Sequence, residues 1–160
     1  NGWVVRKIAK EKKCKKSTGI DKSKKMIIQS KKKIDSKKEG FFHTDIESMK
    51  YKGKFNFIFS MESLYYADSI EEALEKIYKL LKPGGKFFCG TDFYTDNKAT
   101  ARWAGIMKIQ MHLHSKKEWK TLFQNAGFMV KTKHVKDLKN KKKWKREHGT
   151  LFITGIKPER

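Results

Sequence analysis

Cysteine, arginine and acidic residues are all scarce in this chain of 160 residues. Its two cysteines, Cys14 and Cys89, lie far apart and have no metal-ligand spacing, which argues against a disulfide framework and against a zinc site. We therefore expect a reduced, cytoplasmic protein. No apolar run is long enough to cross a membrane and no signal peptide is recognisable, so neither a membrane span nor secretion is expected.

The scarcity of acidic residues leaves a large positive charge, with 39 Lys and Arg against 17 Asp and Glu and a formal net charge of +22. Such a charge is typical of proteins that bind RNA, DNA or an anionic surface. A general lysine bias produces the same number, and here the lysines are spread along nearly the whole chain. Because nucleic-acid readers favour arginine for bidentate contacts, and four arginines are present, nucleic-acid binding stays open as the less favoured interpretation.

Helical and strand-like patterns alternate along most of the chain, and the last two strands follow one another directly. Alternation is typical of a mainly parallel sheet with helices on both faces, and the closing strands are expected to form an antiparallel pair at one edge. Residues 136–148 are predicted to form a loop anchored by Trp144. The predicted helices are 3–9, 23–36, 69–82 and 115–126, with a weaker one within 99–111; the predicted strands are 17–21, 41–46, 55–60, 86–92, 128–135 and 150–156.

The clearest local pattern lies in residues 69–92. Ser69 and Glu72 have the spacing of a capping box, and an apolar stripe at helical period follows them. Pro83 cannot continue the helix, and Gly84 or Gly85 supplies the positive φ of the turn. The apolar segment that follows is a strand, so this stretch is a helix–strand unit.

The chain resembles class I S-adenosylmethionine-dependent methyltransferases of the type 11 group over nearly its whole length. The resemblance rests on Gly2, Asp21, Asp45, residues 60–62 and the run 81–85, in the order and spacing of that family. It implies a Rossmann-like, doubly wound α/β fold with a lid or substrate insert at about 93–114. Because the first strand and the first loop glycines of the family pattern precede Gly2, we expect residues 1–160 to be one methyltransferase domain, a fragment that lacks the first strand.

The resemblance also implies how S-adenosylmethionine is bound. Gly2 would let backbone amides approach the methionyl carboxylate. Asp21 would accept hydrogen bonds from both ribose hydroxyls, although it is also placed to cap the next helix. Asp45 would receive the adenine amino group beside the backbone of Ile46, or would simply cap a turn. Lys22 stands where an apolar residue commonly covers the adenine, and its aliphatic stem could do the same.

The fourth family strand is followed by residues that line the cleft between cofactor and acceptor. The backbone of Ser60 and Met61 is expected to contact the methionyl amino group. Glu62, Tyr65 and Tyr66 are expected on the substrate side, with a loop acid and two packing aromatic rings as the plainer interpretation.

Methyl transfer from a sulfonium needs alignment and the exclusion of water more than it needs a catalytic constellation. If the acceptor must lose a proton, His112 is the candidate base, since histidine titrates near neutral pH; an ordinary loop histidine is the alternative. No metal is expected. The resemblance favours a small-molecule acceptor. An RNA methyltransferase that uses the basic surface and a non-catalytic Rossmann-like binding module are the alternatives.

Overall fold

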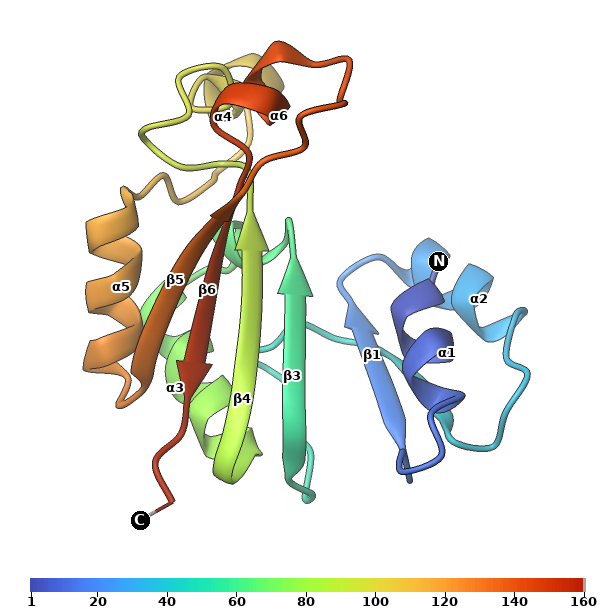
Figure 1. The fold of residues 1–160 in the computed structure, drawn as a ribbon. Helices are drawn as coiled ribbons and strands as arrows, with labels where there is room; N and C mark the ends of the chain where they lie inside the picture. The colour runs from blue at the N-terminus through green and yellow to red at the C-terminus, as the bar shows by residue number, and fades with distance from the viewer. Residues whose placement is uncertain (160) are drawn as a thin grey trace. The chain divides into compact units, whose positions relative to one another are not determined.

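The computed structural model describes residues 1–159, which form two compact units, residues 1–50 and residues 51–159 (Figure 1). The first unit contains a parallel strand pair, β1 (Ser17–Asp21) and β2 (Glu39–His43), in register from Ser17 opposite Glu39 to Asp21 opposite His43. Parallel neighbours need a crossover, and α2 (Lys24–Lys31) supplies it. Together with α1 (Trp3–Ala9), α2 contributes to the small core of this unit, whose buried apolar residues are Ala9, Ile27, Phe41 and Met49.

Two predicted boundaries in the first unit were wrong. The helix expected over 23–36 ends at Lys31, because the lysine-rich residues that follow provide no continuing apolar face and Ile34 is exposed. The strand expected at 41–46 is β2, which begins at Glu39 and ends at His43. Asp45 therefore follows the strand at a distance of two residues.

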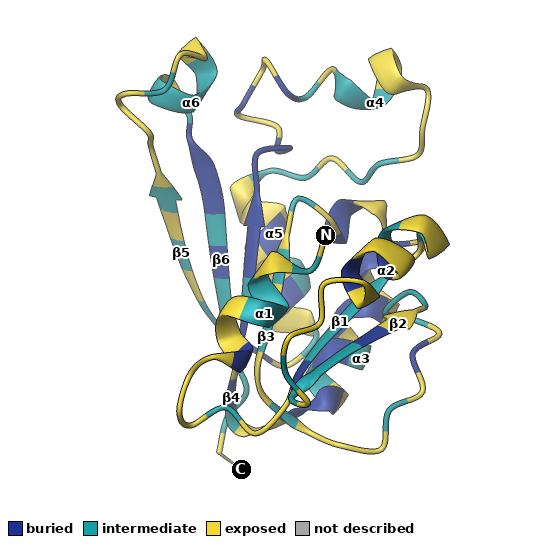
Figure 2. Ribbon diagram, turned by 90° about the vertical axis from the view of Figure 1, so that its right-hand side faces the viewer, coloured by how far each residue is buried: buried dark blue, intermediate teal, exposed yellow. Residues whose placement is uncertain are grey.

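The second unit is built on a sheet with the strand order β3-β4-β6-β5. β3 (Phe55–Met61) and β4 (Leu81–Thr91) are parallel, whereas β6 (Thr150–Ile156) is antiparallel to both β4 and β5 (Met129–Val135). The antiparallel closing pair is thus confirmed, as is the mixed α/β fold class. Figure 2 shows the consequence for burial: β6 is largely buried and the edge strand β5 is half exposed.

Two amphipathic helices cover one face of this sheet. α3 (Ile70–Leu80) and α5 (Lys116–Asn125) contact one another and the strands beneath them. The ring of Phe87 on β4 stacks on Phe123 of α5, with 5.3 Å between centroids and 3° between planes. Both side chains are fully buried, and burying an aromatic side chain contributes about 1.5–3 kcal/mol.

Local sequence signals set the ends of these helices. Ser115 and Glu118 form a complete capping box at α5, and the Ser69 hydroxyl accepts a hydrogen bond from the Glu72 amide (3.2 Å) at α3. α3 ends at Leu80, two residues before the predicted end. β4 begins at Leu81, which pairs with Phe55 of β3. The register between β3 and β4 then shifts at the predicted Pro-Gly-Gly turn, where Gly84 has a φ of 72°.

Two inserts lie beyond the carboxyl end of β4 (Figure 1). The first insert (93–114), where a helix within 99–111 was expected, contains only the short helix α4 (Trp103–Met107). The second insert (136–149) was predicted to be a loop, and this was wrong: it contains α6 (Lys143–Glu147). η1 (Leu64–Tyr66) is a single 3₁₀ turn after β3. No helix within residues 1–159 is both long and apolar enough to cross a membrane.

Candidate functional site

Asp21 lies at the carboxyl end of β1, as predicted, which is the edge where parallel α/β sheets bind ligands. One of its carboxylate oxygens accepts a hydrogen bond from the Ser23 amide (2.8 Å). The cap of α2 is Ser23, whose hydroxyl accepts from the Met26 amide (3.3 Å). Asp21 therefore shapes the turn before the helix without being its cap.

Asp45 and Ile46 lie in the turn that follows β2. An Asp45 carboxylate oxygen accepts a hydrogen bond from the Ser48 amide (2.6 Å), and this bond lowers the pKa of that carboxyl. The turn-capping interpretation of Asp45 is thus realised in the structure. Lys22 is exposed, and its backbone carbonyl accepts from Nε2 of His43 (2.9 Å).

Gly2 has the one backbone conformation in the first unit that requires glycine. Its φ is 71°, immediately before α1, and a Cβ there would lie 2.5 Å from the ring of Phe41. Any side chain would be strained and would also displace that ring. The chain therefore keeps bare backbone at the start of α1.

In the second unit, Ser60 and Met61 end β3, and Glu62 follows directly. The Ser60 hydroxyl lies 2.8 Å from the Ser63 hydroxyl, which holds the start of the following turn. The sulfur of Met61 lies over Gly90, where a Cβ would clash with it. Glu62 has a φ of 53°, an uncommon value for a residue other than glycine.

The Glu62 side chain is half-buried and held by two donors. One oxygen accepts from the Asp92 amide (2.5 Å) and the other from the Tyr65 hydroxyl (3.0 Å). Burial, followed by the nearby negative charge of Asp92, raises the pKa of Glu62 to about 7. This carboxyl therefore titrates in the range in which general acids and bases operate.

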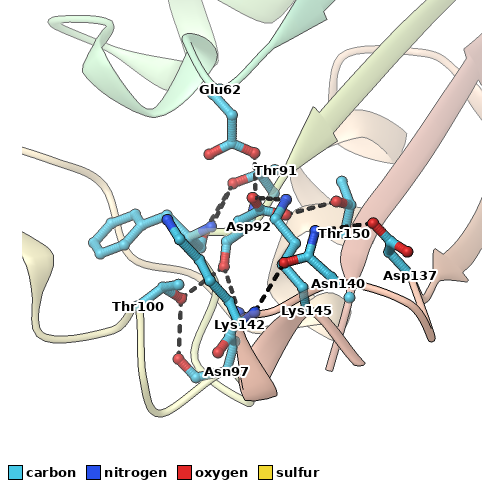
Figure 3. Close-up of polar contacts among 12 residues, drawn as sticks. Glu62, Thr91, Asp92, Asn97, Thr100, Asp137, Asn140, Lys142, Lys145 and Thr150 are labelled. Carbon is cyan, nitrogen blue, oxygen red and sulfur yellow. Dashed lines mark hydrogen bonds and ion pairs between the residues drawn. The ribbon is translucent and has the colours of Figure 1, made fainter. Parts of the chain in front are cut away.

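Asp92 is the centre of a buried polar cluster that the sequence reasoning missed (Figure 3). Its carboxylate pairs with the ammonium group of Lys145 from α6 and accepts from the Thr150 hydroxyl (2.6 Å) at the start of β6. Its backbone carbonyl accepts from the Asn97 amide group (3.0 Å) and from the Thr100 hydroxyl (2.6 Å). The cluster thus joins the end of β4 to both inserts.

A signal for Asp92 was present in the sequence. Like Asp21 and Asp45, it is an acid in the last two residues of a predicted strand, and it belongs to the same strand-end pattern. Its partner Lys145 had no such signal, because it is one of many lysines in a polar stretch.

Tyr65 and Tyr66 have different environments although their rings are in contact, with 4.5 Å between centroids. Tyr65 is buried, its ring packs near Phe93 (5.2 Å), and burial raises the pKa of its hydroxyl. Tyr66 is 38% exposed. Tyr65 thus fixes Glu62, and Tyr66 is the ring that remains accessible.

His112 is half-buried and is tied to η1. Its amide donates to the Tyr65 carbonyl (2.9 Å), and its Nε2 lies 2.9 Å from the Ala67 carbonyl oxygen. A carbonyl can only accept, so Nε2 carries the proton and Nδ1 is the nitrogen that could take another. The structure therefore brings His112, Tyr65 and Glu62 together within one unit. No group of three potential metal ligands is arranged around a common point within residues 1–159.

The fold is that of the Rossmann-like methyltransferases. A model of the methyltransferase domain family matches residues 1–133, and the chain belongs to that family. S-adenosylmethionine is its cofactor. Among curated proteins no match was found.

Solved structures agree with this assignment of the fold. A chain in the complex between the Haloferax volcanii Trm112 methyltransferase activator and the putative methyltransferase has a TM-score of 0.90 at 25% identity, over 98% of this chain and 78% of that one. A putative S-adenosylmethionine-dependent methyltransferase from Listeria monocytogenes has a TM-score of 0.74 at 20% identity, over 91% and 81%. The N-methyltransferase NodS from Bradyrhizobium japonicum WM9, in complex with S-adenosyl-L-homocysteine, has a TM-score of 0.69 at 20% identity, over 91% and 68%.

The residues present fit this cofactor chemically. Asp21 at the end of β1 and Asp45 in the turn after β2 carry acceptor-only carboxylates, suited to hydroxyl and amino donors. At the start of α1, next to Gly2, the Trp3 amide donates to the side-chain oxygen of Asn1 (3.2 Å), so an amide at this position binds an oxygen acceptor.

Proposed function

We propose that this domain transfers the methyl group of S-adenosylmethionine to a small-molecule acceptor by in-line displacement. The observation that carries the proposal is the pair of inserts beyond the end of β4, which are fastened to that strand end by the Asp92 cluster. Such covers exclude water and restrict the size of what can approach the strand ends.

The proposed roles follow the residues described above. In the first unit, Gly2 is assigned to binding of the methionyl part of the cofactor. In the second unit, the backbone of Ser60 and Met61 is assigned to the methionyl amino group. Asp21 would bind the ribose. Lys22, Asp45 and Ile46 would contact the adenine ring. The bound cofactor supplies a sulfonium methyl group that is already activated by its charge.

On the acceptor side, we assign Glu62, Tyr65 and Tyr66 to the substrate cleft and His112 to proton removal. His112 would accept the acceptor's proton at Nδ1 while the proton on Nε2 stays there and is donated in a hydrogen bond to the Ala67 carbonyl. The hydrogen bond to the carbonyl fixes the orientation of the ring, as a general base requires. Glu62 is held in place by Tyr65 and the Asp92 amide.

RNA methylation is the alternative, and the distribution of charge disfavours it. An RNA substrate predicts lysines concentrated around the strand ends, whereas exposed lysines also occur far along the elements, as with Lys31 at the end of α2, Lys79 on α3, Lys120 on α5 and Lys131 on β5. That distribution supports a general lysine bias. A cytoplasmic location belongs to the same proposal.

A protein activator is a further candidate partner. The Haloferax volcanii structure is a complex that contains the Trm112 methyltransferase activator. The chain in that complex that is similar to this protein matches it over 98% of this protein's residues. Co-expression with a Trm112 protein tests this partner: a stable complex on gel filtration supports it, and separate elution contradicts it.

Isothermal titration with S-adenosylhomocysteine tests the proposed function. We expect binding by the cooperatively folded chain and about 10- to 100-fold weaker binding by Asp21→Ala, because hydrogen bonds to a charged group are worth about 1.5–3 kcal/mol. Glu11→Ala, which removes an exposed carboxylate of the same unit, is the matched control and should bind normally. Absence of binding by the folded chain would contradict the enzyme assignment of these residues and favour a binding module.

A further inference from the structure

The two inserts meet through a pair of tryptophans. Trp103 of α4 and Trp144 of α6 pack edge to face, with 5.9 Å between ring centroids and 82° between planes. Trp103 also stacks on Phe93 at 6.3 Å, and Lys145 pairs with Asp92. Residues 101–109 and 136–147, called the tip from here on, are therefore anchored to the strand ends as one structure.

The tip presents aliphatic side chains to solvent. Ile106 is 73% exposed, Leu138 is 75% exposed, and Met107 and Ile109 are more than two-fifths exposed. The two tryptophans already satisfy the packing between the inserts, so these side chains are not needed for it. Several strongly exposed aliphatic residues on two inserts that are joined by the tryptophan pair are typical of an interaction surface.

The same residues carry a strong positive charge. The exposed basic side chains of the tip outnumber its exposed acids, Asp137 and Glu147, by seven to two. Asp137 already accepts hydrogen bonds from Asn140 and from the Lys139 amide, and Glu147 pairs with Lys143. The basic residues are Arg102, Lys108, Lys136, Lys139, Lys141, Lys142 and Lys143.

We propose that the tip docks on the surface of an anionic phospholipid bilayer. Its aliphatic side chains would enter the boundary between headgroups and acyl chains, and its lysines would lie among the lipid phosphates. This inference rests on the proposed function and specifies its acceptor class. The acceptor would be an amphiphilic molecule that passes from the bilayer to the strand ends beneath the tip.

The exposed residue types favour a bilayer over a nucleic acid. Single-stranded nucleic acids are bound by free aromatic faces and by arginine. The aromatic rings of the tip, Trp103 and Trp144, are half-buried against one another, and the exposed apolar side chains are aliphatic. Arg102 is the one exposed arginine in the tip. An anionic bilayer surface instead binds proteins through aliphatic side chains that enter the membrane and lysines that contact the lipid phosphates.

Co-sedimentation with lipid vesicles tests the proposal on the whole chain. We expect binding to phosphatidylcholine vesicles that contain about a third phosphatidylglycerol, little binding to pure phosphatidylcholine, and release by salt. Ile106→Gln with Leu138→Gln should weaken binding about 100-fold, since each loses about 1.5 kcal/mol of apolar burial. Lys139→Gln with Lys141→Gln and Lys142→Gln should weaken it about 100-fold, at roughly 1 kcal/mol per charge.

Matched controls separate the tip from the general charge of the chain. Ile28→Gln replaces an aliphatic residue that is 46% exposed on α2, and Lys116→Gln with Lys117→Gln and Lys120→Gln removes three exposed charges from α5. Equal losses in the tip and control variants would overturn the proposal, as would failure of the wild-type chain to bind the anionic vesicles.

Preferential binding of a single-stranded RNA oligonucleotide through the tip lysines would also overturn the proposal and assign the surface to nucleic acid. Titration of S-adenosylhomocysteine into the same variants keeps the two proposals apart, because the tip variants should retain cofactor binding. Cofactor binding without vesicle binding would defeat the docking proposal and leave the methyltransferase site standing.

Discussion

The titration of Glu62 gives the sharpest test of the strand-end cluster. Burial and the charge of Asp92 raise the pKa of this carboxyl from its ordinary value of 4.5 to about 7. At about 1.4 kcal/mol per tenfold change in proton affinity, the full shift corresponds to roughly 3 kcal/mol. Because part of the side chain remains in water, we reduce this to about 1.5 kcal/mol.

The direction follows from proton uptake. Between the two pKa values the folded chain binds more protons than the unfolded chain, so the free energy of unfolding falls as the pH rises from about 4.5 to about 7. Stability from this group is fully present below the lower value and is lost above the higher one. Glu62→Gln is neutral at every pH, and its amide can accept from the Asp92 amide and donate to the Tyr65 hydroxyl.

Urea unfolding of wild type and Glu62→Gln at about pH 5 and about pH 8 measures the effect. Relative to wild type, the variant should gain about 1.5 kcal/mol between the two pH values. Glu75→Gln, which replaces an exposed carboxylate 3.4 Å from the Lys79 ammonium, should show no such gain. The reasoning would be refuted if the free energy of unfolding of Glu62→Gln, relative to wild type, did not change between the two pH values or was higher at about pH 5 than at about pH 8.

Two further predictions concern the stability of the second unit, both measurable by urea unfolding. Lys145→Met leaves the buried Asp92 carboxylate without its cation and should lower the free energy of unfolding by about 3 kcal/mol. Lys143→Met removes an exposed ion pair and should lower it by less than about 1 kcal/mol. Equal losses in the two variants would contradict the argument from burial. Gly149→Ala places a Cβ against the backbone of β5 at a φ of 69° and should lower the free energy of unfolding by at least about 2 kcal/mol. Gly105→Ala has open space around its Cβ within α4 and should raise the free energy of unfolding by about 0.5–1 kcal/mol. A Gly149→Ala variant as stable as wild type would show that the turn can relax.

The parts of the fold that the sequence predicted correctly are those with their own periodic or capping signal. The boundaries of α5 follow from the capping box at Ser115 and the glycine at 127, and the boundaries of α1, β1 and β6 were predicted to the residue. Among the site residues, Asp21 was placed correctly at a strand end because the acid directly follows a run with strand character.

The errors arise where tertiary contacts decide the conformation. α6 has five residues and no apolar period, and it is held by Trp144 against Trp103 and by Lys145 against Asp92, contacts that no local pattern reveals. β2 begins early because Glu39 pairs with Ser17 across the sheet. The raised proton affinity of Glu62 depends on a residue 30 positions away, and so it could not be predicted from the chain around it.

The strand order of the second unit also has a consequence for how the protein is made. β6 is the last strand within residues 1–159, yet it lies between β4 and β5. During synthesis β5 emerges from the ribosome first and has no neighbour to pair with until β6 has followed it. The sheet therefore closes late, through contacts between distant residues, and such contacts form slowly. A chain cut before residue 150 would lose two strands from the sheet although it lacks the sequence of only one, and β5 would be left as an unpaired, lysine-rich segment open to proteases.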